Sequence, residues 1–290
     1  MSTPRTAGLW LLLAITISAC SDSVGAGTDA GSADDAASTA DDAAPAAGNA
    51  DAASNANPDA ALRPDALPSP DAGPPSPVVL NEILADPPGT DGNNEFIEIR
   101  CTPGLSLATF TLMIVEGDFN MGDPTERGKV TFAKDLAGVS CGSGGFVILQ
   151  LRSVYDDFAT TTYVDDYFTT NLQNGTQTYL LMTGGPFADM DIDDDDDGVV
   201  DDPAFTANIV DSVAFSDGFA DDLVYSPAVL VLASGPDAAS RFASNTSAST
   251  QASWYFGSVT GPSPTHYDPT EVSANFPAGG ILSPGEANSP

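Results

Sequence analysis

Basic residues are scarce in this sequence, which has 8 Lys and Arg against 41 Asp and Glu and a formal net charge of −33. A field of this sign repels nucleic-acid phosphates and anionic lipid headgroups, and it attracts divalent cations and basic partners. We therefore expect no nucleic-acid partner. The simplest interpretation of the same charge is solubility, or a saline or calcium-rich exterior.

Histidine is almost absent. The single histidine, His266, lies in a Gly- and Pro-rich segment over 261–267, which predicts a surface loop. A zinc site or a Ser–His triad would need further ligands or an activated nucleophile beside it, and the sequence has no Gly-x-Ser-x-Gly motif. We therefore predict that the protein is not an enzyme, with a secreted hydrolase as the weakest alternative.

Long apolar runs are also missing, since spanning a bilayer takes about 20 apolar residues. The run over 9–19 follows Arg5 and has the length typical of a signal-peptide core. It ends in Ile-Ser-Ala-Cys, which resembles the lipobox of bacterial lipoproteins with Cys20 as its cysteine. We expect residues 1–19 to be a lipoprotein signal peptide. We expect Cys20 to carry the lipid, which includes a palmitate chain. Plain secretion with an incidental cysteine is the alternative.

A lipid on Cys20 makes the membrane a partner and places the chain in the cell envelope, because acyl chains anchor proteins through buried methylene groups. Ser21 follows the cysteine, and the absence of Asp there favours the outer membrane or the cell surface. Residues 20–77 consist largely of Asp, Ala, Ser, Gly and Pro. Such a segment buries too little apolar surface to fold, so we predict a disordered acidic tether.

Only three cysteines are present. With Cys20 lipidated, Cys101 and Cys141 remain as an even pair in an oxidising compartment, where a disulfide is the expected outcome. Two free thiols are the alternative.

From residue 78 onward the pattern predicts one all-β domain over 78–290. Short runs of β-branched and aromatic residues alternate with Gly, Pro, Asn and Asp clusters, and no helical period of useful length is present. This pattern favours a β-sandwich. The predicted strands are 78–84, 95–100, 109–116, 129–132, 145–151, 177–182, 209–215 and 228–233, with a last one near 253–257.

Several segments of this domain resemble the lamin tail domain family. The opening strands, Val-Leu-Asn-Glu-Ile-Leu over 79–84 and Asn-Glu-Phe-Ile-Glu-Ile over 94–99, are similar to its first two strands. Three later segments are similar to its C-terminal landmarks: Ser240-Arg241-Phe242, Ser253-Trp254-Tyr255 and Ser283-Pro284-Gly285-Glu286-Ala287-Asn288. The sequence departs from the family at Arg100-Cys101, where many members have Tyr-Asn, and in an acidic insert near 189–204.

The resemblance implies an immunoglobulin-like β-sandwich with Trp254 near its core. It also implies that Glu82 and Glu98 are framework residues bonded to loop backbone. Bacterial members are surface or secreted modules, so we expect a non-catalytic module with a structural, adhesive or protein-interaction role. Catalysis by the two glutamates, as in glycosidases, is the competing interpretation.

The acidic insert contains the pattern D-x-D-x-D-G-x-x-D, which is typical of calcium loops. Asp193, Asp195, Asp197 and Asp201 supply carboxylates, and Val199 supplies a carbonyl. Calcium prefers such hard oxygen ligands, so we predict calcium as the cofactor. A solvated acidic loop that only attracts counterions is the alternative.

Two features separate this loop from a complete EF-hand. The twelfth position, which usually supplies a bidentate carboxylate, is Ala204, and Asp189, Asp191 or Asp202 would have to replace it. The flanking prolines predict that neither flank is helical.

A late group of aromatic residues suggests another ligand. Aromatic platforms bind sugars, so a carbohydrate-binding module with a glycan partner is the alternative function, against packing in the core. The group consists of Trp254, Tyr255, Phe256, Tyr267 and Phe276.

Overall fold

The computed structural model describes most of the chain from residue 78 onward. The predicted signal peptide, the tether and Cys20 lie outside the described residues. Among the described residues, no helix is long and apolar enough to cross a membrane. The described ranges are 78–89, 94–119, 126–152, 154–155, 157–168, 172–185, 187–261 and 265–289.

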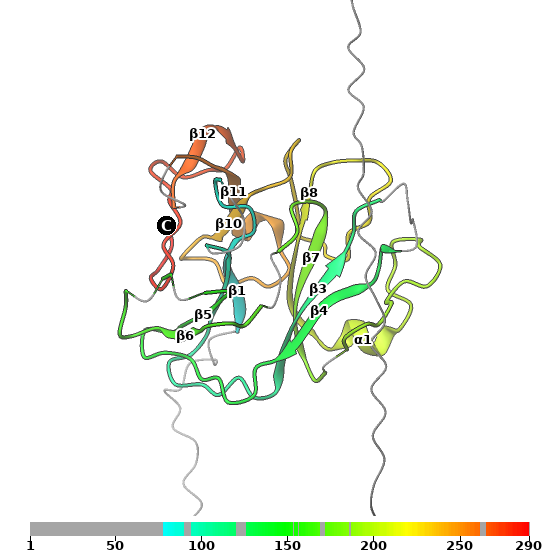
Figure 1. Ribbon diagram of the computed structural model, residues 1–290, viewed down its shortest axis with the longest axis horizontal. Coiled ribbons are helices and arrows are strands. Elements are labelled where there is room, and N and C mark those ends of the chain that lie inside the picture. Colours follow the sequence, from blue (N-terminus) through cyan, green and yellow to red (C-terminus); the bar gives the residue numbers. More distant parts are fainter. Residues whose placement is uncertain are drawn as a thin grey trace, which may run out of the picture. The chain divides into compact units, whose positions relative to one another are not determined.

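The larger of two β-sheets has seven strands in the order β12-β11-β10-β1-β2-β5-β6 (Figure 1). All neighbours are antiparallel except β5 and β6, which are parallel. The strands are β1 (Val79–Leu84), β2 (Phe96–Arg100), β5 (Phe146–Gln150), β6 (Thr162–Val164), β10 (Ala238–Arg241), β11 (Trp254–Val259) and β12 (Tyr267–Val272).

The smaller sheet has five strands in the order β4-β3-β7-β8-β9. Its neighbours are antiparallel except β8 and β9. The remaining elements are one short α-helix and one 3-10 helix, so the described domain is an all-β sandwich, as predicted. The bounds are β3 (Phe110–Glu116), β4 (Val130–Asp135), β7 (Gln177–Thr183), β8 (Ile209–Ser216), β9 (Val229–Val231), α1 (Pro203–Ala207) and η2 (Gln251–Ser253).

The main core lies between the two sheets. Alternate residues of the central strands point into it, as the two-residue period of a strand requires. Ile97 and Ile99 of β2 pack there with Leu112 and Ile114 of β3 in one cluster of buried residues, and Tyr179 of β7 meets Phe215 of β8 edge-on. Burial at about 25 cal/mol per Å² of apolar surface is the main stabilising term for such a core.

The outer face of each sheet is also covered. On the small sheet, Met113 and Leu180 pack against Ile192 and Phe205 of the segment that joins β7 to β8. On the large sheet, the C-terminal segment contributes Leu282 to a second cluster. The acidic insert is therefore a packed layer of the domain, because its apolar residues seal a sheet face.

Each predicted strand overlaps an observed one, but three observed strands were not predicted. The strand β6 has only three residues, and β10 consists mainly of small residues. The strand β12 contains Pro269 and, in addition, three polar or charged residues. None of them has the large apolar content that marks a strand in sequence. Pro269 fits its position, because β12 is an edge strand and proline is tolerated there.

The prediction of non-helical flanks around the acidic insert is wrong on its C-terminal side. The helix α1 begins at Pro203. Proline suits this position because the first N–H of a helix has no partner within the helix and because the fixed φ of proline matches a helical turn. The Asp202 side chain caps it by accepting a hydrogen bond from the Ala204 N–H at 2.8 Å.

The predicted disulfide between Cys101 and Cys141 is confirmed. It joins the residue after β2 to the segment before β5, with 6.2 Å between the two Cα atoms and a sequence separation of 40. In the chain-entropy model, closing a loop of this length stabilises the folded state by about 3–4 kcal/mol.

A buried ion pair connects the two sheets. Arg241 of β10 donates to Asp211 of β8 at 2.5 Å, and both side chains are fully buried. Arg241 Nε also donates to the Leu80 carbonyl, while the Leu80 N–H donates to Asp211. The guanidinium stacks on Trp254, 4.5 Å from the ring centroid, so the pair is satisfied on all sides.

Neutralising Asp211 tests this connection. We expect Asp211→Asn to lower the free energy of unfolding by about 3–5 kcal/mol, because Arg241 would remain buried without a counter-charge. Urea unfolding of the full chain measures this loss. Glu271→Gln, on the exposed edge strand β12, is the matched control and should change stability by less than about 1 kcal/mol. Equal stability of the two variants would contradict the role of the pair.

Candidate functional site

Acidic side chains gather at one end of the small sheet. Neighbouring strands among β4, β3, β7 and β8 are antiparallel. The C-terminal ends of β3 and β8 therefore lie beside the N-terminal ends of β4 and β7, at one end of the sheet. The acidic loop, residues 191–201, also reaches this end, since the Ile192 N–H donates to the Gly128 carbonyl at 2.9 Å. Segments far apart in sequence thus supply carboxylates to one region.

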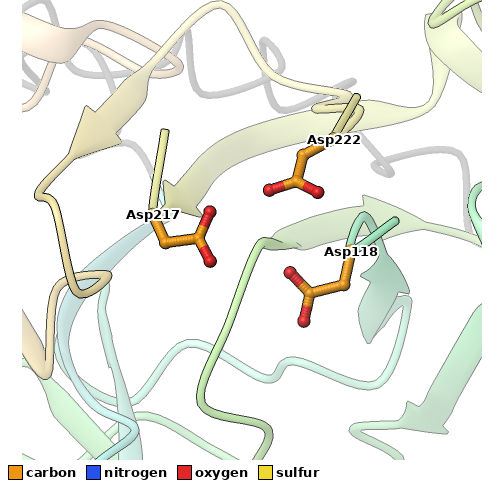
Figure 2. Close-up of side chains that lie close together, drawn as sticks. All are labelled: Asp118, Asp217 and Asp222. Atoms are coloured by element: carbon orange, nitrogen blue, oxygen red, sulfur yellow. The ribbon is translucent and has the colours of Figure 1, made fainter. Parts of the chain in front are cut away.

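Three aspartates form the aspartate cluster: Asp118 after β3, and Asp217 and Asp222 after β8. Figure 2 shows their carboxylates pointing toward a common space. One oxygen of each lies within 4.8 Å of the others. Thr176 connects them, since its N–H donates to Asp118 at 2.6 Å and its hydroxyl donates to Asp222 at 2.8 Å.

The aspartate cluster is short of positive charge. Burial raises the pKa of Asp118, and the neighbouring charges of Asp222 and Asp217 raise it further. Burial likewise raises the pKa of Asp217, with Asp222 adding to the shift. Glu116 beside them also has a raised pKa, caused first by burial and then opposed in part by its backbone hydrogen bonds. A cation among these groups would relieve their mutual repulsion.

The acidic loop brings together three of its five predicted calcium ligands. Oxygens of Asp193, Asp195 and Asp197 lie within 4.8 Å of one another. Asp193 is fully buried, and it accepts hydrogen bonds from the Gly198 N–H at 2.8 Å and from the Tyr225 hydroxyl at 3.1 Å. The Asp195 carboxyl is solvent-exposed, and its pKa is raised mainly by the charge of Asp197.

Of the other two predicted ligands, Asp201 contributes no oxygen to this group. Asp201 accepts a hydrogen bond from the Asp194 N–H at 2.7 Å, and Val199 is 62% exposed. Of the substitutes, Asp191 accepts from the Asp193 N–H at 3.1 Å, and Asp202 serves as the helix cap. Asp189 has a backbone φ of 58°.

Arg127 contacts both the acidic loop and the segment after β8. Its Nε is 3.6 Å from the Asp196 carboxylate, and its NH1 donates to the Asp221 carbonyl at 2.7 Å. Its guanidinium also lies over the Phe119 ring, 5.3 Å from the centroid. This one side chain therefore connects the acidic loop to the segment after β8 and offsets part of the charge of the loop.

An open hollow of about 1040 Å³ lies beside the aspartate cluster. Its walls come from four segments: after β3, before β4, before β7 and after β8. The lining residues are Glu116, Asp118, Phe119, Glu126, Thr131, Gln173, Asn174, Asp217, Phe219, Ala220, Asp221 and Asp222.

Glu82 and Glu98 form a second carboxylate pair, far from the hollow in sequence and on the large sheet. They are opposite each other in β1 and β2 and fully buried. Glu82 accepts from the Ser283 N–H at 2.9 Å, and Glu98 accepts from the Gly285 N–H at 2.6 Å. The expectation that both bond to loop backbone is confirmed, and the loop is the C-terminal segment.

The late aromatic residues do not form an exposed platform but pack in the core and on the large sheet, which was the other interpretation of this group. Trp254 and Phe256 belong to the main core, and Tyr255 and Tyr267 to the cluster on the outer face of the large sheet. Phe276 packs edge-on against Tyr255, 5.3 Å between centroids. His266 is exposed, and its Nδ1 lies 3.3 Å from the Thr265 hydroxyl.

Comparison with known proteins identifies no relative. No family model, curated protein or solved structure matches the chain.

The aspartate cluster was not found from the sequence, because its members come from two distant segments. A usable signal was present. Strands predicted to end at 116 and 215 are each followed within two residues by an aspartate, and both could end at the same edge of one antiparallel sheet.

The buried glutamates predict a specific pH dependence. Burial raises the pKa of Glu82 from 4.5 to about 8, and burial and Glu82 together raise that of Glu98. A carboxyl with a raised pKa in the folded state stabilises it below pH 4.5 and loses that contribution as the pH rises through about 8. We expect the free energy of unfolding to fall over this interval.

Urea unfolding at a series of pH values measures the slope, and Glu82→Gln should flatten it. Glu271→Gln, which alters an exposed carboxylate, should keep the slope of the parent chain. Stability that rises over the interval in the parent would show that the buried pair is ionised without cost.

Proposed function

We propose that this chain is a non-catalytic lipoprotein of the cell envelope. It presents an immunoglobulin-like sandwich of the lamin tail type for a structural, adhesive or protein-interaction role, with calcium bound at the acidic loop. Its lipid is attached to Cys20, on the outer membrane or at the cell surface. Its partners are the membrane and a protein or glycan outside the cell.

Two features support export and anchoring. The lipobox-like sequence ends at Cys20, and the only other cysteines form the Cys101–Cys141 disulfide. Disulfides persist in oxidising compartments such as the periplasm and the cell surface, which agrees with a chain that acts outside the cytoplasm.

The lamin tail assignment is supported by the way its landmark segments contact one another. Asn288 donates to the carbonyls of Asn81 and Arg241, both at 3.0 Å. The hydrogen bonds from Ser283 to Glu82 and from Gly285 to Glu98 join the C-terminal landmark to the first two strands. Residues chosen for their resemblance in sequence thus form one hydrogen-bonded group, as a shared framework would require.

The observation that carries the calcium proposal is the convergence of Asp193, Asp195 and Asp197 on a packed loop. Ile192 before them is buried on the outer face of the small sheet, and Asp193 is bonded to Tyr225. A loop fixed in this way loses little entropy when an ion binds.

The carbohydrate-binding alternative was suggested by the late aromatic residues. Their rings are packed against each other and the core, so they do not support it.

Calcium titration tests the ion. We expect isothermal titration of the full chain to show saturable calcium binding, and Asp193→Asn, Asp195→Asn and Asp197→Asn together to remove it, because each change takes away one anionic ligand. Asp268→Asn, a half-buried aspartate on β12, is the control and should bind like the parent. Equal weak heats in the triple variant and the parent would refute calcium at this loop.

Labelling with radioactive palmitate in cells tests the anchor. We expect the parent chain to take up the label and to fractionate with membranes, and Cys20→Ala to lose both, because the acyl chains supply the membrane affinity. A Cys20→Ala chain that still fractionates with membranes would argue against lipid anchoring.

A further inference from the structure

The hollow at the end of the small sheet combines negative charge with exposed aromatic surface. Its rim carries Phe119, which is 37% exposed, and Phe219, which is 71% exposed. They are the two aromatic residues among the large exposed hydrophobic side chains of the described ranges. Because the Phe219 ring leaves apolar area in water beside an acidic hollow, a ligand with both apolar and cationic groups would suit this surface.

One wall of the hollow already illustrates how a cation is recognised there. The Arg127 guanidinium lies over the Phe119 ring and donates to the Asp221 carbonyl. This combination of an aromatic face and oxygen acceptors is the one that binds lysine and arginine side chains well. The Phe219 ring and the carboxylates that line the same hollow offer this combination to an incoming cation.

The size of the hollow favours a ligand larger than a metal ion. Its volume of about 1040 Å³ is at the upper end of the range for ligand pockets, about 300–1,000 Å³, whereas one water molecule takes about 30 Å³. Glu116 and Asp221 line it without belonging to the aspartate cluster. Acids distributed over several walls suit a ligand with several separate positive charges.

A narrower apolar slot continues from the hollow. It has a volume of about 240 Å³ and shares Thr131 and Gln173 with the hollow. Its other walls include Ile114, Phe132 and Phe168. An acidic chamber that opens into an apolar slot fits a chain in which basic and apolar side chains occur side by side.

We infer that the hollow is the docking site for a basic polypeptide segment of a partner protein. Lysine or arginine side chains lie among the carboxylates and against Phe219, and an apolar side chain of the partner fills the slot. The inference rests on the proposed role as an interaction module and names the chemistry of its partner. It requires neither calcium nor the lipid anchor.

Fluorescence anisotropy with a labelled synthetic peptide of alternating lysine and leucine tests the site on the full chain in the presence of EDTA. We expect saturable binding that weakens as salt is added, because exposed charges are screened. The double variant Phe219→Ser and Asp221→Asn should weaken binding about tenfold, since it removes an exposed ring and a charge. Both residues are exposed, so this variant should fold like the parent.

Matched controls separate this site from general attraction to an acidic protein. Ile281→Ser and Glu271→Gln remove an exposed apolar side chain and an exposed charge elsewhere, and they should bind the peptide within twofold of the parent. Equal affinity of the double variant and the parent would overturn the inference, as would the absence of saturable binding. Release of the peptide by stoichiometric calcium, lost in Asp118→Asn, would assign the aspartate cluster to a metal ion instead. Each of these failures leaves the calcium titration of the acidic loop and the membrane fractionation unaffected.

Discussion

The ion pair between Arg241 and Asp211 is the contact on which the arrangement of the two sheets depends. It joins β10 to β8 in an interior from which water is excluded, and both partners also bond to the backbone of Leu80 in β1. Withdrawing two charges from water is costly, so the pair is tolerable only because its donors and acceptors are used. The position of β8 against β1 is thereby fixed, and with it the place where β8 ends and its aspartates begin.

The acidic insert has a structural reason to be present. The outer face of the small sheet carries Met113, Val115, Leu180 and Met182, which would form a large apolar surface if it were bare. The insert covers this face and carries its own carboxylates to the edge. Arg127 pairs with Asp196 of the insert and so offsets part of the negative charge that the insert brings.

Local patterns in the sequence were sufficient for much of this architecture. Strands with a run of large apolar residues, such as β3 and β7, were predicted within one residue at each end, because burial and strand propensity coincide there. The convergence of Asp193, Asp195 and Asp197 was also predictable, because the three residues lie within five consecutive positions of one turn. The pairing of Cys101 with Cys141 was predicted from the expected oxidising compartment and from the even number of cysteines that remain after Cys20.

What the sequence could not reveal depends on pairing between distant segments. The strand β10 lies between β1 and β11 although its residues are small, because its place is set by neighbours on both sides. To predict the aspartate cluster, one would have to know that β3 and β8 end on the same side of β7, which lies between them in the sheet. Sheet order is a long-range property, and no window of the sequence contains it.

The position of β1 has a mechanical consequence. Residue 78 leads directly into a strand that is flanked by β10 and β2, and not into an edge strand. A pull applied to the chain from its N-terminal side would therefore load two rows of backbone hydrogen bonds at once, together with the bonds of Leu80 to Asp211 and Arg241. A central strand loaded in this way resists extraction more strongly than an edge strand, which has a single row of such bonds.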